Sequence, residues 1–424
     1  MTAMDHVLHL RCLICGAEHR PDTVAYVCPA HGVDGVLDVV YDYGLIGTST
    51  SRESMGAGAG MWRFRPLLPV ELETPVPPIL VGDTPLIEAP RLAARAGVAR
   101  LWIKDEGRQP TASLKDRASA MAVAKAAERK IEMITTASTG NAAAALAGMC
   151  AAAGVRAVIF VPAAAPPAKI AQLHAFGAAV VLVQGRYDQA VDLSMAAAER
   201  RGWYNRNTGF NPYMTEGKKT VVYEVCESLG WDPPDVITVG VGDGCIIGGL
   251  HKGLRDLLAL GWIEHMPRLV GVQAEGSAYL ADAWRFDEDV LTKPAITAST
   301  VADSIAAGLP RDRIKAMAAV RDTGGVFVTV SDAEILAAIP AVARASGVFG
   351  EPAAAASWAG LLAAVEAGAV GGADRVVIMS TGSGLKDVAA ASRGAEAAGI
   401  TAVAVRADGG DLDEALDRLE MGAR

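Results

Sequence analysis

Short runs of β-branched residues alternate with Ala-rich segments of helix length through most of the chain beyond residue 100. Short apolar runs predict buried strands, and the longer Ala-rich segments predict helices. Strands that alternate with helices favour parallel, doubly wound sheets with helices on both faces. The predicted strands are 101–104, 132–136, 155–161, 179–183, 236–241, 268–273, 326–330, 375–380 and 401–405, and the predicted helices are 118–129, 142–153, 188–200 and 411–422.

Length and composition exclude several classes of protein. With 424 residues the chain is long enough for two lobes and a small appendage. The formal net charge is −9, and no cluster of Lys and Arg offers the surface that a nucleic acid needs. No uninterrupted apolar stretch is long enough to cross a membrane. Residues 1–10 lack a secretory signal pattern, so we expect a cytoplasmic protein without nucleic-acid or membrane partners.

Three of the six cysteines lie within the first 28 residues. Cys12, Cys15, Cys28 and His31 form a C-x2-C and C-x2-H pattern, which can supply the tetrahedral site of three sulfurs and one nitrogen that Zn²⁺ prefers. In a cytosolic chain such clusters indicate metal ligands before disulfides. A structural zinc in a zinc-ribbon-like segment is therefore expected, with a chance pairing in a loop as the alternative.

Four loops that follow predicted strands carry small or hydroxyl residues where a helix begins. Exposed N–H groups and the helix dipole attract an anion at such positions. The loops are 109–117, 138–141, 240–245 and 380–387.

The sequence motifs of other common active sites are incomplete or absent. The run that begins at Gly240 has Cys245 where a dinucleotide fingerprint requires Gly, and no acidic residue follows at the expected distance. The run 217–220 resembles the end of a P-loop, but Pro212 stands where the first Gly belongs. No G-x-S-x-G elbow is present, and no His lies near these loops, which disfavours hydrolysis with a His base.

Lys115 remains as a lysine within a polar Thr-x-Ser-x-Lys-Asp-Arg loop. A Schiff-base lysine needs a lowered pKa and a carbonyl partner. From chemistry alone, a surface lysine at a helix start explains this residue equally well.

The loops resemble, in order, the signatures of threonine synthases and related fold-type-II pyridoxal-phosphate (PLP) enzymes. Residues 110–117 are similar to P-T-G-S-F-K-D-R, and residues 82–86 match G-x-T-P-L. The matches continue with the strand 102–106, the asparagine loop 138–141, the N-P-x-x-x-E-G-x-K-T run at 211–220 and the T-G-x-G-L-K-D loop at 381–387. The resemblance spans almost the whole chain and implies two doubly wound parallel-sheet lobes with the zinc-ribbon-like segment in front. It places that segment at 1–40, a large PLP-binding domain at 41–110 plus 216–424, and a small α/β domain at 111–215.

The resemblance also implies roles for individual residues. Lys115 would form the Schiff base with PLP and then move the protons. Thr381 would face the pyridine nitrogen, where a hydroxyl moderates the electron sink and so favours elimination and replacement at Cβ or Cγ. The other cofactor contacts would be Asn141 at the 3′-oxygen and Gly242, Asp243, Gly244, Cys245 and Ile246 in the phosphate cup. The substrate contacts would be Ser138, Thr139, Gly140, Lys104 and Ser113.

Departures from the family pattern concern the substrate more than the cofactor. Cys245 and Ile246 replace the second Gly and Asn of the G-N-x-G-N phosphate cup, although backbone N–H groups remain to bind PLP. Residues 300–305 lack the Arg of the A-I-R-I-G-like segment of threonine synthases, which weakens the case for a second, substrate phosphate. Lys104, Lys218, Lys219 and Arg117 remain as candidate anion contacts.

Three functions stay open at this stage. The first is a threonine-synthase-type lyase that converts O-phospho-L-homoserine and water to L-threonine and phosphate. The second is a paralogue that performs β-elimination or β-replacement on serine, threonine or O-phosphoserine-like amino acids. The third is a zinc-ribbon binding protein whose α/β body has lost its activity. The resemblance implies a homodimer that acts on a small amino acid.

Overall fold

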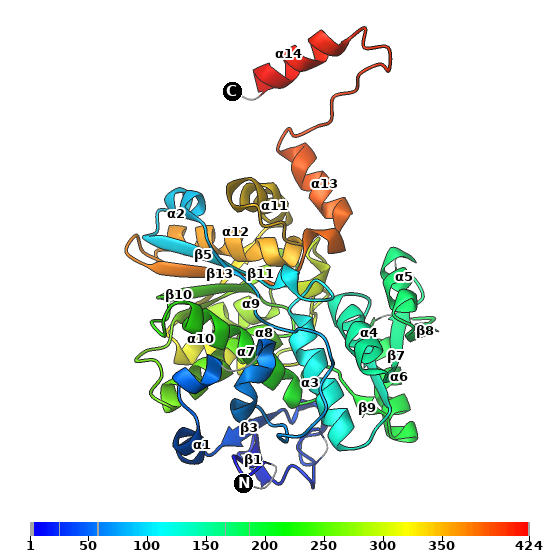
Figure 1. Cartoon of the computed structure of the whole chain (residues 1–424), viewed down its shortest axis with the longest axis vertical. Coiled ribbons are helices and arrows are strands. Elements are labelled where there is room, and N and C mark those ends of the chain that lie inside the picture. Colours follow the sequence, from blue (N-terminus) through cyan, green and yellow to red (C-terminus); the bar gives the residue numbers. More distant parts are fainter. Residues whose placement is uncertain (1–3, 25, 57–58, 166, 186, 423–424) are drawn as a thin grey trace.

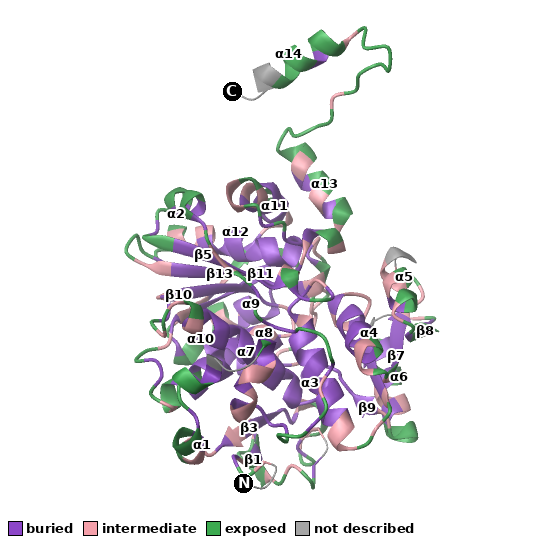
Figure 2. Ribbon diagram, in the orientation of Figure 1, coloured by how far each residue is buried: buried purple, intermediate pink, exposed green. Residues whose placement is uncertain are grey.

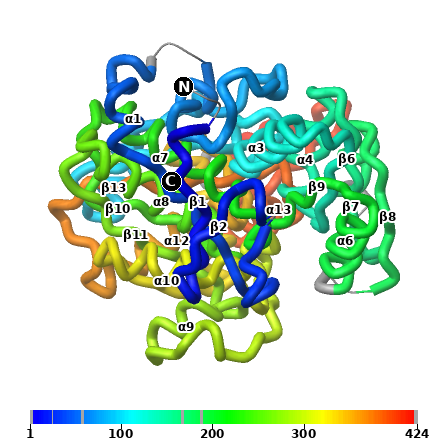
Figure 3. The backbone as a smooth tube through the Cα atoms, turned by 90° about the horizontal axis from the view of Figure 1, so that it is seen from below, coloured from blue at the N-terminus to red at the C-terminus, as the bar shows by residue number. Residues whose placement is uncertain are grey.

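The computed structural model describes residues 4–24, 26–56, 59–165, 167–185 and 187–422. Two sheets flanked by helices form the body, and a small antiparallel sheet lies at the N-terminus (Figure 1). This small sheet has the order β2-β1-β3, with β1 at Val7–Cys12, β2 at Glu18–His19 and β3 at Leu37–Tyr41. Seen from below, the N-terminal segment lies across the larger lobe (Figure 3).

The larger sheet has six strands in the order β12-β11-β10-β13-β5-β4. Its neighbouring strands are parallel except for the edge pair β4–β5, which is antiparallel. The strands are β4 Leu86–Glu88, β5 Arg100–Asp105, β10 Val236–Gly240, β11 Arg268–Ala274, β12 Val326–Val330 and β13 Arg375–Ser380.

The smaller sheet is parallel throughout, in the order β8-β7-β6-β9. Its strands are β6 Met133–Ala137, β7 Arg156–Pro162, β8 Ala179–Val183 and β9 Tyr204–Asn205. The helices that accompany the two sheets are α1 Tyr43–Ser49, α2 Pro90–Ala96, α3 Lys115–Glu128, α4 Asn141–Ala153, α5 Pro167–Ala175, α6 Tyr187–Arg201, α7 Tyr213–Ser228, α8 Cys245–Ala259, α9 Tyr279–Phe286, α10 Arg313–Asp322, α11 Asp332–Ser346, α12 Pro352–Glu366, α13 Val388–Ala397 and α14 Leu412–Gly422.

Successive residues of the central strands enter two different apolar cores. Val236 and Val376 pack with residues of α11 and α12, whereas Ile237 and Val377 pack with residues of α8 and α10. Side chains of a strand alternate between the faces of its sheet, so a strand that is apolar on both faces requires helices on both. Figure 2 shows these strands buried within the larger lobe. The predicted doubly wound α/β class is confirmed.

The predicted elements match the structure except at the C-terminus. Eight of the nine predicted strands and all four predicted helices are present, with ends shifted by a few residues at most. The strand predicted at 401–405 is wrong, because this segment has no regular structure and is mostly exposed. It runs away from the body to α14, where no neighbouring strand can pair with it (Figure 1). Among the described residues, no helix is long and apolar enough to cross a membrane.

A buried ion cluster joins β5, α3 and α7. Nη2 of Arg117 lies 2.8 Å from Oε1 of Glu106 and 2.7 Å from Oε2 of Glu224. Nζ of Lys104 lies 2.7 Å from the same Glu224 oxygen. Burial by itself would raise the pKa of Glu224, but the charges of Arg117 and Lys104 hold it well below its ordinary value. The cluster therefore holds both cations in fixed positions.

We expect Glu224→Gln to lower the free energy of unfolding by about 3 kcal/mol or more, because it removes one partner of a buried ion pair. Denaturant unfolding followed by circular dichroism measures the change. Glu88→Gln, which breaks the exposed pair between Glu88 and Arg100, is the matched control and should cost less than about 1 kcal/mol. Equal losses for the two variants would contradict a structural role for the cluster.

Candidate active site

One cavity lies at the edge of the larger sheet where its parallel strands end. Residues 240–247, which follow β10 and begin α8, form most of its wall. Lys115 lines the cavity from α3, and Ser304 and Ile305 line it from the segment before α10. In open α/β sheets, ligands bind beyond the carboxyl ends of the strands, and this cavity has that position.

Lys115 is the first residue of α3 and follows a tightly held loop. The N–H of Leu114 donates to the carbonyl of Thr381 at 2.9 Å, and the N–H of Ser383 donates to the carbonyl of Ala112 at 3.0 Å. These bonds join the lysine loop to the loop after β13. Ala112 stands where the family has Gly and adopts a φ of 65°, a left-handed conformation that a Cβ disfavours. The loop keeps the glycine-like conformation without the glycine.

The surroundings of Lys115 lower its pKa to about 8. Burial is the largest cause, and the positive charge of Lys218 adds to it. At pH 7, about a tenth of such amines are neutral, which is far more than for a lysine in water. Lys115 thus has the lowered pKa that a nucleophilic amine requires.

The predicted phosphate cup consists of the loop Gly242–Gly244 before α8 and the first two residues of that helix. Gly244 precedes this helix with a φ of 88°, and a Cβ there would lie 2.9 Å from the carbonyl oxygen of Asp312. The carbonyl of Asp243 accepts from the N–H of Asp312 at 2.8 Å, and this bond ties the loop to the residue before α10. The first N–H groups of a helix lack partners within the helix and attract an anion.

Asn141 begins α4 at the end of the smaller sheet and reaches across to the larger lobe. Its Nδ2 donates to both carboxylate oxygens of Glu351, at 2.8 and 3.0 Å, and lies 3.5 Å from Oγ of Ser304 on the cavity wall. The loop Ser138–Gly140 just before it is partly exposed, and the N–H of Gly140 donates to Oγ of Ser138 at 3.1 Å. Asn141 therefore belongs to the group around the cavity.

Glu351 is a site residue that the sequence analysis missed. It precedes α12, and its N–H donates to the carbonyl of Gly382 at 3.0 Å. Burial raises its pKa to about 7, despite the hydrogen bonds from Asn141. The only local signal was an acidic residue before a Pro at the start of an Ala-rich helix.

The structure separates Lys104 from the other predicted site residues. Its ammonium is fully buried between Glu224 and the carbonyl of Thr84, which accepts at 2.6 Å. This position gives Lys104 a structural role and does not support a substrate contact. Ser113, by contrast, lies next to Lys115 and pairs with Gly382 in an isolated bridge. Thr381 lies beside this same loop, because its carbonyl accepts from the N–H of Leu114.

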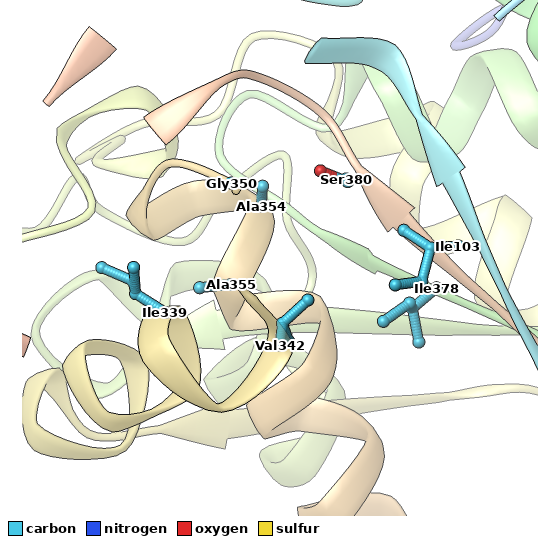
Figure 4. Close-up of a pocket in the computed structure, with 8 residues that line it drawn as sticks. All are labelled: Ile103, Ile339, Val342, Gly350, Ala354, Ala355, Ile378 and Ser380. Atoms are coloured by element: carbon cyan, nitrogen blue, oxygen red, sulfur yellow. The ribbon is translucent and has the colours of Figure 1, made fainter. Parts of the chain in front are cut away.

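A second cavity, between the larger sheet and helices α11 and α12, has little polar chemistry. Figure 4 shows side chains such as Ile103, Ile339 and Ile378 around it, with Ser380 as its hydroxyl residue. The Oγ of Ser380 is buried without a hydrogen-bond partner among the described residues. No charged side chain lines this cavity. It is an apolar gap in the packing next to the site.

The predicted metal ligands come together in the N-terminal segment. Each of the four residues Cys12, Cys15, Cys28 and His31 offers one ligand atom, and these atoms all lie within 4.8 Å of one another. Sγ of Cys12 lies 3.8 Å from Nδ1 of His31. All three cysteines are free thiols. Three sulfurs and one imidazole nitrogen fit a closed tetrahedral Zn²⁺ site.

The residues around Lys115 also fit PLP. Oγ of Ser113 is buried without a partner within the described part of the chain, so a polar ligand atom can satisfy it. The start of α8 offers N–H groups to a phosphate, and Lys115 offers an amine of lowered pKa to an aldehyde. The donor set therefore matches a phosphate and an aldehyde at one cavity, with the Ser113 hydroxyl, two residues before the lysine, for a further polar atom.

Comparison with known proteins agrees with this chemistry. Residues 78–382 match the family described as pyridoxal-phosphate dependent enzyme. The threonine synthase of Methanosarcina acetivorans is 40% identical, covering 89% of this chain and 92% of that protein. The threonine synthase of Methanocaldococcus jannaschii is 35% identical, covering 91% and 95%.

Solved structures agree at the level of the fold. The processed form of threonine deaminase isoform 2 from Solanum lycopersicum superimposes with a TM-score of 0.65 at 23% identity, over 75% of this chain and 84% of that one. A fungal L-serine ammonia-lyase from Rhizomucor miehei gives a TM-score of 0.63 at 22% identity, over 74% and 97%. From the family match and the two long alignments, we conclude that this chain belongs to the pyridoxal-phosphate-dependent enzymes and, within them, to the threonine synthase family.

Proposed function

We propose that this chain converts O-phospho-L-homoserine and water to L-threonine and phosphate. The observation that carries the proposal is that Lys115, with its pKa lowered to about 8, opens into the same cavity as the N-terminus of α8. The threonine synthase relatives, aligned over about nine-tenths of the chain, support this choice of reaction.

The proposed roles combine the family resemblance with the places of the residues in and around the cavity. Bound PLP supplies an aldehyde for an amino group and an electron-withdrawing ring that stabilises negative charge at Cα and Cβ of the substrate. Lys115 holds the cofactor and then takes the protons from Cα and Cβ, a task that suits an amine with a pKa near working pH. Residues 242–246, the loop before α8 and the first two residues of that helix, would hold the cofactor phosphate. Phosphate would leave from Cγ of the substrate, a proton would be added at Cγ, water would add its hydroxyl at Cβ, and a proton would return to Cα.

The remaining residues orient the reactants. Asn141 would hold the 3′-oxygen of the cofactor, and the proximity of Glu351 places a second proton-holding group beside that amide. Thr381 would present a hydroxyl to the pyridine nitrogen. The N–H groups of Ser138, Thr139 and Gly140 would bind the substrate carboxylate, with Ser113 as a further polar contact. The proposal also keeps a cytoplasmic location, together with domain limits at residues 110 and 216 and a homodimer, of which the last two are supported by the family resemblance.

A second candidate is β-elimination or β-replacement on serine, threonine or O-phosphoserine. The observation that favours it is the segment Asp303–Ile305, which stands where the family pattern has an Arg and lines the cavity with Ser304 and Ile305. Among the described residues that line the cavity, Lys115 is the only cation. The Asp303 carboxylate itself pairs with Lys169. A substrate phosphate would therefore need a cation from outside this wall.

Assays of phosphate release and amino-acid products separate the two functions. We expect O-phospho-L-homoserine to yield equal amounts of phosphate and L-threonine, and O-phospho-L-serine to yield little of either. Lys115→Ala should lower the rate by roughly a thousandfold or more, because it removes both the cofactor bond and the proton carrier. If serine or threonine gives a keto acid while neither phosphorylated substrate reacts, the threonine synthase reaction is wrong.

The rate of PLP capture by the cofactor-free protein should rise with pH to a plateau, with a midpoint near 8. The reason is that only the neutral amine attacks, and burial together with Lys218 lowers the pKa of Lys115 from 10.5 to about 8. Absorbance of the bound cofactor, followed by stopped flow from pH 6.5 to 10, measures the rate. Nα-acetyl-lysine with the same cofactor is the control, and its rate should keep rising toward pH 10. A protein profile that coincides with this control would refute the lowered pKa.

The metal site is proposed to hold one structural Zn²⁺ per chain, supported by the clustering of its four ligand atoms. Cys12→Ser should lose most of the zinc measured by elemental analysis, because a closed site needs all four ligands. Cys150→Ser, at a buried cysteine outside the cluster, should keep it. Unchanged zinc in the Cys12 variant, or no zinc in the parent protein, would remove this assignment.

A further inference from the structure

Lys218 is a buried lysine directly behind the phosphate cup. It lies on α7 and is fully buried. Its Nζ contacts Sγ of Cys245, which is the first residue of α8 and lines the cavity. Lys218 therefore stands at the helix N-terminus that is assigned to the cofactor phosphate.

Close packing of α7 against α8 holds Lys218 in this place. A Cβ at Gly249 would lie 3.0 Å from Cβ of Lys218, and a Cβ at Gly253 would lie 2.8 Å from the carbonyl oxygen of Lys219. The two helix backbones approach so closely because both positions of α8 lack a side chain. Lys218 consequently has little room to move away from Cys245.

Within the described part of the chain, Lys218 has no carboxylate partner, unlike the fully buried Lys104 and Lys219. Nζ of Lys104 lies 2.7 Å from Glu224, and Nζ of Lys219 lies 2.6 Å from Asp256. Across the described residues, no carboxylate oxygen lies within 4 Å of Nζ of Lys218. The surplus charge acts on the site, since it contributes to the lowered pKa of Lys115.

The acidic groups of the cup near Lys218, Asp243 and Cys245, do not form an ion pair with its ammonium. Oδ1 of Asp243 accepts from the N–H of Arg311 at 3.2 Å. Burial raises the pKa of the Cys245 thiol above its ordinary value even with Lys218 beside it, and Asp312 raises it further. The thiol is therefore neutral near pH 7, and it gives the ammonium a contact without a counter-charge.

An uncompensated ammonium is costly in a buried position, and an anion bound beside it offsets that cost. Lys218 occupies the variable position of the E-G-x-K-T run, and Cys245 departs from the cup pattern, which has Gly there. The two unusual residues contact each other at the site of a phosphate. Together they indicate an anion site in which a side-chain charge supplements the backbone N–H groups.

We propose that Lys218 is the counter-charge for the phosphate monoester bound in the cup, and that this phosphate is the 5′-phosphate of PLP. The inference rests on the proposed place of PLP at the start of α8. It assigns a binding role to a residue that lies behind the cavity wall and acts through its charge.

Affinity for PLP and for pyridoxal, which lacks the phosphate, tests the proposal. Lys218→Met should weaken PLP binding by roughly tenfold to a hundredfold, the range expected for losing a charge-assisted contact. Pyridoxal binding should change far less, so the ratio of the two dissociation constants is the measured quantity. Both compounds form the same bond to Lys115, so any change in the pKa of that amine cancels in the ratio.

Two further readouts separate phosphate binding from a merely structural role. Without cofactor, Lys218→Met should be at least as resistant to heat as the parent protein, because it removes an uncompensated buried charge. Lys218→Arg should restore part of the PLP preference. Lys169→Met, which removes a lysine paired with Asp303 outside the cup, is the control for net charge and should leave the ratio unchanged.

An unchanged ratio in Lys218→Met and Lys218→Gln would overturn the proposal. If the ratio stays constant while the PLP-saturated variant shows a raised KM for O-phospho-L-homoserine and weaker inhibition by inorganic phosphate, the charge serves the substrate phosphate instead, which also contradicts it. Failure of the proposed reaction is distinguishable, because an enzyme that binds PLP but produces no threonine still shows the change in ratio.

Discussion

The burial of Arg117 between two carboxylates is the constraint on which the site depends. Arg117 lies two residues after Lys115, and its partners Glu106 and Glu224 come from the loop after β5 and from α7. Removing Arg117 would leave Glu106 buried without this cation, and removing Glu224 would leave Lys104 buried without this carboxylate, so the charges depend on one another. Because α3 begins at Lys115, the cluster sets the position of its first turn. The reactive amine is placed by an ion cluster that takes no part in the chemistry.

Near this ion cluster lie two buried groups whose pKa values are shifted in opposite directions. Lys115 has a lowered pKa and Glu351 a raised one, and burial is the main cause of both shifts. Each group therefore changes charge near neutral pH, which is the property that proton transfer requires. Lys218 adds a positive charge behind the cup and lowers the pKa of Lys115 further. The same charge thus links the anion site to the reactivity of the amine.

Much of the fold and part of the site could be predicted from local patterns. Eight of the parallel strands are recognisable because each is a short, largely apolar run, and loops of small or hydroxyl residues follow four of them. The strand predicted at 401–405 failed because a β-branched run forms a strand only where a neighbour can pair with it. Lys104 satisfied the motif but lies in the ion cluster. Glu351 was missed because its environment is made by Asn141 and Gly382, which are distant in the sequence.

The sequence by itself determined the α/β class, the four loops and the lysine around which they gather, because hydrophobic period and turn residues are local properties. Only the tertiary structure decided which charges are compensated. Lys104, Lys218 and Lys219 are similar in the sequence, yet two have carboxylate partners and Lys218 faces Cys245. The effect of a buried charge depends on groups brought near it by long-range packing. That is why the sequence could indicate the loops that are proposed to bind the cofactor, whereas only the packing of α7 against α8 could point to the lysine that is proposed to hold its phosphate.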